Sequence, residues 1–340
     1  MNKKILLVFL AGLFLLLTTQ LAYADRGIIP IDPDVSVYEP GQKAIIAWNG
    51  ETEILILSTD VTSIRETKVV EILPLPSKPE SVEAASFHSF EEIQKIIFQY
   101  ISEYAVQRYG AKATRALSEE IEVVFHEKIG AHDITVVKAS DPAVLVDWID
   151  AFLAENGVDK EVSLGRFEPV VAEYMARGFR FYVLDIIDAS SKKRSIEPIL
   201  YKFNSSFLYY PLKITSPLGG NTKITLFIIT EDLVKDGYYP FREATFQASK
   251  PEPMKIKLCK GELSKIDLRI GEIFSGEAWL TILLYEGDIS RLDEDLILTE
   301  KNFTQASPLS PLIPYVVLGC LLYTSPSPRD LSTSRMPSSA

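Results

Sequence analysis

Apolar runs separated by turn residues predict a β-rich start to the chain. Residues 42–48 and 52–59 are two such runs, and Asn49-Gly50 between them is typical of a tight hairpin turn because both residues tolerate positive φ. A third strand is predicted over residues 66–73. It should end where the prolines begin, or Pro74 and Pro76 should lie on a sheet edge, because proline lacks the N–H group that a sheet needs.

Two later segments have the helical spacing of apolar residues. Ser89 and Glu92 form a capping box, and the helix that they predict ends at Gly110. Its apolar stripe consists of Ile93, Ile96, Ile97, Tyr100, Ile101 and Tyr104. Asp141-Pro142 predicts the start of a second helix with a buried face of Leu145, Trp148, Ile149, Phe152 and Leu153. A shorter helix is predicted over residues 169–177.

Further strands are predicted by apolar runs at residues 121–125, 134–137, 179–187, 207–215, 222–230 and 278–285. Strands cluster instead of alternating strictly with helices, which favours an α+β fold. We expect a mainly antiparallel sheet with two or three packed amphipathic helices. A proline-rich stretch near residue 250 predicts a boundary between a domain at 25–250, with Trp48 and Trp148 in its interior, and a small, mostly β region at 251–310.

Both ends of the chain suggest export and anchoring. Lys3 and Lys4 precede an apolar run, and Ala22-Tyr23-Ala24 follows it, so residues 1–24 are predicted to be a signal peptide. Residues 312–319 are apolar and predict the start of a C-terminal transmembrane helix within 311–340. The serine- and proline-rich sequence after it resembles translated sequencing-adapter read-through, so we expect a non-native tail. The expected location is the extracytoplasmic face of the cell membrane, or secreted without the anchor.

Composition adds two limits. Apolar residues make up 47% of the chain, enough to bury a large core. The formal net charge is −11, and such an acidic surface repels phosphate backbones, so nucleic acid is not expected as a partner.

Three segments together carry a family resemblance: "EILPLPSKPE", "KIGAHDITVVKASDPAVLVDWI" and "LYYPLKITSPL". With them, residues 25–230 resemble the secreted family catalogued as domain of unknown function 2330. Members often open with a Cys-Gly pair, whereas this chain has Asp25-Arg26-Gly27 after the predicted signal peptide. That family has no assigned activity. The resemblance therefore implies a fold and a location, and no catalytic residue.

The proline cluster of the first segment has two interpretations. Pro76 to Pro79 match the P-x-x-P pattern that SH3-type grooves bind. Such domains are mostly intracellular, whereas this chain is expected to be exported. We therefore predict a rigid turn with Lys78 facing solvent.

Candidate metal ligands are sparse. His126-Glu127 begins like a zinc motif, but Gly130 stands where the second histidine is needed. His126 and His132 could meet across a hairpin, beside Glu127 or Asp133, without an evident fourth ligand. We favour a solvated turn, and we expect neither a metal nor a cofactor.

Two other patterns are weaker. Ser190 and Lys193 have S-x-x-K spacing but lack the partner motifs that activate a serine. The acidic run Asp288, Asp293, Glu294 and Asp295 lacks the spacing of a calcium loop, so a solvated acidic face is predicted.

Two function classes follow. The first is a non-catalytic envelope protein that binds an unknown extracytoplasmic partner or ligand, or serves a structural role. The second is an extracellular hydrolase whose dispersed carboxylates converge, with Glu71, Glu168, Glu173 and Asp185 as candidates. Two buried carboxylates facing each other in a deep polar cleft would favour the hydrolase. We expect the binding or structural class, because acidic residues are plentiful enough for chance candidates.

Overall fold

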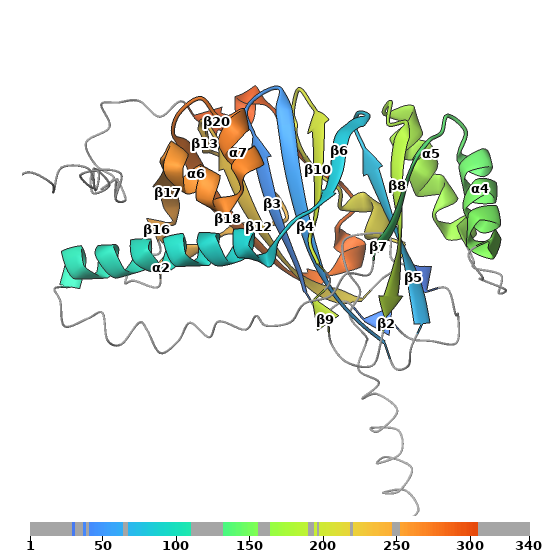
Figure 1. The fold of residues 1–340 in the computed structure, drawn as a ribbon, viewed down its shortest axis with the longest axis horizontal. Coiled ribbons are helices and arrows are strands. Elements are labelled where there is room, and N and C mark those ends of the chain that lie inside the picture. Colours follow the sequence, from blue (N-terminus) through green and yellow to red (C-terminus); the bar gives the residue numbers. More distant parts are fainter. Residues whose placement is uncertain are drawn as a thin grey trace, which may run out of the picture.

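A computed structural model describes residues 29–30, 37–38, 41–63, 67–109, 132–155, 164–189, 194–195, 197–217, 220–246 and 252–304. Its centre is a large sheet (Figure 1). In spatial order its main strands are β14 (Arg242–Glu243), β18 (Ala278–Asp288), β12 (Asn221–Thr230), β3 (Gln42–Trp48), β4 (Thr52–Ser63), β10 (Ile199–Asn204) and β6 (Pro79–Ala84). β12 and β3 are parallel, and the other neighbours along this path are antiparallel.

Shorter strands extend this sheet. β17 (Lys255–Leu258) pairs with β18, whereas β2 (Val37–Tyr38) and β9 (Arg194–Ser195) pair with β4. A second, antiparallel sheet has the order β1 (Ile29–Pro30), β5 (Thr67–Leu75), β8 (Phe181–Ala189) and β7 (His132–Lys138). Small two-stranded sheets join β11 (Leu208–Tyr210) to β19 (Leu296–Leu298), β13 (Leu233–Val234) to β20 (Phe303–Thr304), and β15 (Thr245–Phe246) to β16 (Glu252–Pro253).

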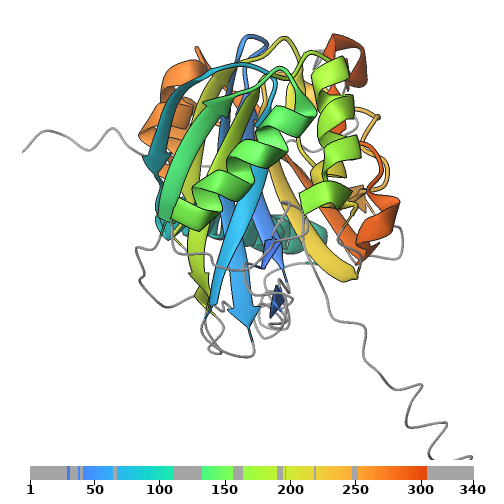
Figure 2. The same ribbon diagram turned by 90° about the vertical axis from the view of Figure 1, so that its right-hand side faces the viewer.

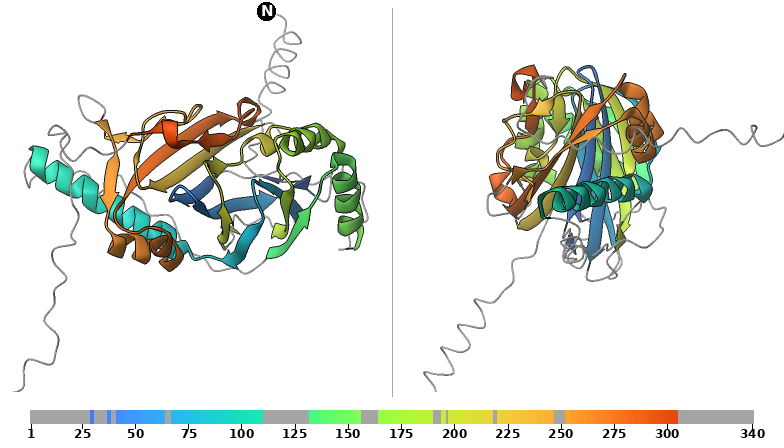
Figure 3. Two further views of the ribbon diagram at one scale, coloured as in Figure 1. Left: turned by 90° about the horizontal axis from the view of Figure 1, so that it is seen from above. Right: turned by 90° about the vertical axis from the view of Figure 1, so that its left-hand side faces the viewer.

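Helices lie at the two opposite ends of the molecule (Figures 1 and 3). α2 (Phe87–Tyr109), α6 (Lys260–Ile266) and α7 (Leu268–Ile273) pack on one face of the large sheet. α4 (Pro142–Glu155) and α5 (Glu168–Ala176) lie in front of the second sheet in Figure 2. The α+β class with mainly antiparallel sheets is confirmed. The described residues contain five α-helices, more than the two or three expected.

Both faces of the large sheet are buried, because successive side chains of a strand point to opposite faces. In β3, Ile45 and Ala47 pack under α2, α6 and α7, whereas Ala44 and Ile46 face the second core. This second core continues through the second sheet to α4 and α5 and contains fully buried tyrosines, among them Tyr201 and Tyr209. The apolar residues therefore form two cores, one on each face of the large sheet.

Four local expectations need correction. The first long helix begins at Phe87, and Ser86 caps it by accepting a hydrogen bond from the His88 N–H at 3.1 Å. Trp48 is buried as expected, but Trp148 is 39% exposed and stacks on Phe152 at 5.0 Å between ring centres. The buried residues of α4 are Leu145, Ile149 and Leu153, which form one narrow stripe. The stripe is narrow because the helix packs against the protein on one side only.

The other two concern strands. The strand predicted over residues 207–215 ends at Tyr210, because Pro211 cannot donate to a sheet, and Lys213–Thr215 form a short 3-10 helix, η2. The strand expected to end at residue 73 continues through Pro74 to Leu75. On the edge of β5 that faces β1, the described residues pair only at Val69 and Val70. Pro74 lies beyond that pairing, so no N–H group is required from it on this edge. The strand predicted at residues 121–125 lies outside the described residues.

Residues beyond 250 are closely paired with residues before it. β18 lies between β12 and β14, and its register with β12 runs from Asn221–Asp288 to Thr230–Trp279. α6 and α7 join α2 over the same core. The division near residue 250 stays a prediction.

Candidate functional site

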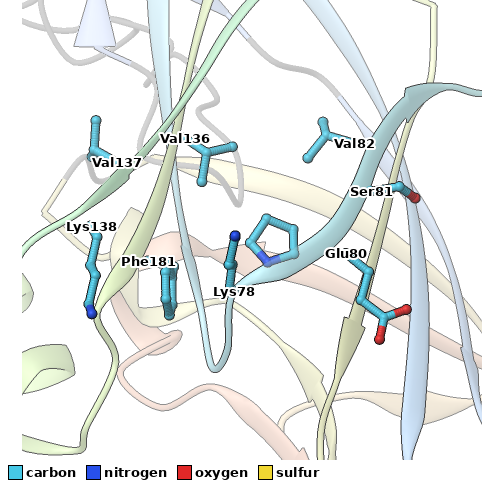
Figure 4. Close-up of a pocket in the computed structure, with 9 residues that line it drawn as sticks. Lys78, Glu80, Ser81, Val82, Val136, Val137, Lys138 and Phe181 are labelled. Carbon is cyan, nitrogen blue, oxygen red and sulfur yellow. The ribbon is translucent and has the colours of Figure 1, made fainter.

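A pocket of about 540 Å³ opens between the edge strands of the two sheets (Figure 4). β6 ends one side of the large sheet, and β7 ends one side of the second sheet. The pocket is lined by Lys78, Pro79, Glu80, Ser81, Val82, Val136, Val137, Lys138 and Phe181. Three valines and the Phe181 ring make much of its wall apolar, and two ammonium groups stand beside them.

The turn between β5 and β6 carries Lys78 and is the predicted proline turn. Asn204, at the end of β10, fixes this turn. Its backbone carbonyl accepts a hydrogen bond from Ser77 Oγ at 2.7 Å, and its Nδ2 donates to Glu80 Oε1 at 2.8 Å. Pro76 and Pro79 restrict the backbone on either side of Lys78. The turn prediction therefore describes one edge of the pocket.

Charges around the pocket are unbalanced. Glu80 is engaged by Lys202, whose Nζ lies 3.2 Å from Glu80 Oε2, and its carboxylate points away from Lys78 in Figure 4. Lys138 Nζ lies 5.9 Å from the centre of the Phe181 ring, which is its cross-strand partner. Among the described residues neither Lys78 nor Lys138 has a carboxylate partner. The pocket of this acidic chain is thus locally positive.

A buried carboxyl pair lies in the second sheet. The β5–β8 register places Glu71 directly opposite Asp185, and their side chains are only 1% and 2% exposed. Directly opposite residues have Cβ atoms about 4.5–5.5 Å apart. The fold therefore brings together two of the four hydrolase candidates, although neither lines the pocket.

The other two hydrolase candidates lie on the surface. Glu168 is exposed at the start of α5, and Glu173 is paired with Lys213 at 2.5 Å. They give no support to a catalytic arrangement.

Glu53 is a buried acid that the sequence did not single out. Its side chain is 0% exposed, and burial raises its pKa well above the ordinary value, opposed in part by the Tyr209 N–H that donates to Oε2 at 2.7 Å. Its Oε1 has no hydrogen-bond partner among the described residues. Tyr209 also donates its hydroxyl proton to the Pro74 carbonyl at 3.2 Å. It thereby links Glu53 of the large sheet to the second sheet.

Asp295 is the centre of another buried network, and the expectation of a solvated acidic face is wrong for it. Its side chain is 0% exposed. Oδ1 accepts from the Tyr174 hydroxyl at 2.6 Å and from the N–H groups of Leu212 and Lys213, at 2.9 and 3.0 Å. Oδ2 accepts from Arg177 at 2.7 Å. Asp295 thus joins the start of η2 to α5, and both its carboxylate oxygens accept hydrogen bonds within the fold.

The histidine and serine candidates remain open. His126, Ser190 and Lys193 lie outside the described residues, and His132 is the first residue of β7. No cluster of three or more histidine, cysteine, aspartate or glutamate side chains with metal-binding geometry occurs within the described ranges. That His126 and His132 belong to a solvated turn and do not bind a metal stays a prediction.

Sequence reasoning missed most of the pocket. Lys78 is predicted only as a solvent-facing turn residue, Val136 and Phe181 only as strand residues without a site, and Lys138 follows the strand predicted at 134–137. The sequence contains one indication of the pocket. Both the turn that carries Lys78 and the segment "ITVVK" belong to the sequences that carry the family resemblance. Only the pairing of strands shows that they meet.

In the described part of the chain, no helix is both long and apolar enough to span a membrane. The predicted start of the anchor lies outside that part.

Comparisons with known proteins give a family and no activity. Among solved structures, the chain is similar to baculovirus P35, with a TM-score of 0.43 and 10% identity over 80% of this chain and 99% of that one. It is also similar to a mutated baculovirus P35 after caspase cleavage, with a TM-score of 0.40 and 9% identity over 76% of this chain and 99% of that one. No curated protein matches.

The family model described as an uncharacterized protein conserved in bacteria, domain of unknown function 2330, matches residues 22–239. This match covers more than half of the chain and includes the turn and the strands around the pocket. The chain belongs to the family of domain of unknown function 2330.

Proposed function

We propose that this protein is an exported binding protein of the cell envelope, and that the pocket between β6 and β7 takes an anionic ligand with an apolar portion. One observation carries the proposal. Lys78 and Lys138, which have no carboxylate partner among the described residues, stand beside an apolar wall in a chain with a net charge of −11. Apolar walls with a few placed polar groups are the usual composition of ligand sites.

The geometry supports binding by a preformed site. Ser77 and Asn204 hold the turn that carries Lys78, and the β7–β8 pairing holds Lys138 and Phe181 opposite each other. A held site loses little conformational entropy when a ligand enters. An anion between two such ammonium groups gains charge interactions, and the apolar wall gains burial.

Anilinonaphthalene sulfonate is a suitable probe, because it combines a sulfonate with apolar rings and fluoresces in apolar sites. We expect it to bind the mature protein, and the double variant Lys78→Glu, Lys138→Glu to bind it at least about tenfold more weakly. The control Lys301→Glu changes another exposed lysine, on η4 (Glu300–Asn302), and should bind as the wild type does. Equal binding by the double variant would refute the pocket as the site.

Export and anchoring belong to the same proposal. They are supported by the signal-peptide pattern of residues 1–24 and by the apolar segment at 312–319. N-terminal sequencing of the protein from the producing cell should begin at Asp25, and the protein should fractionate with membranes. A chain retained in the cytoplasm with Met1 intact would contradict this part.

Hydrolysis is the second candidate, and the Glu71–Asp185 pair favours it. Retaining glycosidases use two carboxyl groups that lie close together, and the β5–β8 register places Glu71 and Asp185 opposite each other. Both side chains are at most 2% exposed, so a substrate has no access in this conformation. Binding is therefore the better supported function. Glycosidase activity on nitrophenyl glycosides that disappears in Asp185→Asn would reverse this order.

A further inference from the structure

Among the described residues, no strand pairs with the outer edges of the two strands that border the pocket. In an antiparallel pair, alternate residues turn both their N–H and C=O toward the partner, and the residues between them turn both groups away. The Ala139 N–H donates to the Arg180 carbonyl at 2.8 Å, directly after the β7–β8 register ends at Lys138–Phe181. Val136 and Lys138 therefore turn their backbone groups away from β8, toward the open edge.

The same alternation applies to β6. The Ala85 N–H donates to the Pro198 carbonyl at 2.7 Å, next to the Ala84–Ile199 pair. Val82 consequently turns its backbone groups away from β10. Val82 and Val136 both line the pocket. A ligand lying there meets outward backbone donors and acceptors as well as side chains.

The two edges differ in how well they are protected. β6 begins at Pro79 and carries Glu80 and Glu83, and proline and charge are the devices that keep other strands from pairing with an edge. β7 has the uncharged run Ile134–Thr135–Val136–Val137, in which Val136 is 40% exposed. Its sequence favours strand pairing at the side of the pocket. Within the described residues no strand occupies that side.

We infer that the ligand is an extended polypeptide segment that pairs with the free edge of β7 and places a carboxylate near Lys78 and Lys138. The inference rests on the proposed function and specifies its ligand. A strand satisfies the outward groups of Val136, which an acyl chain cannot do. Its alternate side chains reach Val82 and Phe181. Charge complementarity selects an acidic residue or a free carboxyl terminus.

The test begins with a random library of peptides of about eight residues with free carboxyl termini, selected on the mature protein. A selected peptide, labelled with fluorescein, is titrated by fluorescence polarisation and should compete with anilinonaphthalene sulfonate. Methylating alternate amide nitrogens of the peptide should weaken binding at least about tenfold, because strand hydrogen bonds are lost while side chains remain.

Two protein variants distinguish the contribution of the Val136 backbone to binding from that of its side chain. Val136→Ala keeps the outward N–H, whereas Val136→Pro removes it at a position where the β7–β8 ladder does not need it. We expect Val136→Pro to bind the peptide at least about tenfold more weakly than Val136→Ala. Where Val136→Pro fails to fold, the methylated peptide gives the answer alone.

Each other outcome overturns the inference in a distinct way. Methylated and unmethylated peptides that bind equally would exclude strand pairing. Selection of no peptide, with sulfonate binding still dependent on the two lysines, would reject the polypeptide ligand and leave the proposed function standing. A dimer in solution that Val136→Pro dissociates would assign the β7 edge to a second copy of the chain.

Discussion

The ammonium group of Lys138 lies 5.9 Å from the centre of the Phe181 ring, across the β7–β8 pair at the pocket. This contact places a cation against an aromatic face while both groups still border the open space. Such contacts at exposed sites contribute about 0.5–1 kcal/mol. The pair therefore holds Lys138 in place without neutralising its charge.

Replacing the ring tests this relationship. Phe181→Leu keeps an apolar side chain but removes the aromatic face, so sulfonate binding should weaken about two- to fivefold. The free energy of unfolding should change by less than about 1.5 kcal/mol, because Phe181 is only half-buried. The control Phe98→Leu alters an aromatic ring of α2 that is 42% exposed. Equal weakening in both variants would contradict a specific role for Phe181.

Glu53 predicts a pH dependence of stability. Its pKa in the folded protein is raised by burial above the ordinary value of 4.5. Folding therefore favours the protonated acid, and this contribution is complete below pH 4.5 and is lost as the pH rises through the folded pKa. Glu53→Gln, which cannot ionise, should be about as stable as the wild type at pH 4.5 and more stable at pH 8.

Urea unfolding at several pH values measures this difference. The advantage of Glu53→Gln should grow by up to about 1.4 kcal/mol per pH unit between the unfolded and the folded pKa. Glu231→Gln, at an exposed position after β12, is the matched control and should show no such growth. A constant difference between Glu53→Gln and the wild type would show that Glu53 does not titrate with folding.

Asp295 predicts a large loss of stability. Asp295→Ala leaves the N–H groups of Leu212 and Lys213 and the Tyr174 hydroxyl without their acceptor. Removing one partner of a buried, hydrogen-bonded charge costs about 3–5 kcal/mol. Chemical denaturation should show that loss for Asp295→Ala and less than about 0.5 kcal/mol for Asp293→Ala, an exposed neighbour. Similar values for the two variants would refute the network.

The C-terminal part should be required for folding. β12 pairs with β18 over ten residue pairs, from Asn221–Asp288 to Thr230–Trp279. A chain that ends at Phe246 loses this partner and the helices α6 and α7. Calorimetry should show one transition for the mature protein and none for the shortened chain. Two separate transitions in the mature protein would mean that residues 252–304 fold independently.

Much of the fold could be predicted from the sequence where local signals were strong. Strand β3 matches its apolar run residue for residue, and the expected hairpin to β4 forms. Asn49 Oδ1 accepts from the Thr52 N–H at 2.8 Å, and of the two predicted turn residues Gly50 has a positive φ and Asn49 does not. β10 and the helices α6 and α7 were not predicted. Lys202 interrupts the apolar run of β10, and each of the two helices spans at most seven residues, too few to show a clear helical period.

The candidate site was harder to predict, because it depends on contacts between distant segments. Lys78 and Lys138 lie 60 positions apart in the sequence. They line the same pocket because it lies between β6 and β7, the edge strands of two different sheets. The same limit applies to Glu71 and Asp185, whose opposition follows from the β5–β8 register. Asp295 looked like part of a solvated run, since nothing in its neighbourhood shows that α5 will cover it.

Methyl resonances can locate a ligand most directly. On titration with anilinonaphthalene sulfonate, we expect the methyl signals of Val82 and Val136, which line the pocket, to shift together, while those of the buried Val234 stay in place. The exposed apolar stripe of α4, with Val144 64% exposed and Trp148 beside it, is the rival surface. Shifts confined to Val144, with Val82 and Val136 unchanged, would contradict the assignment of the binding site.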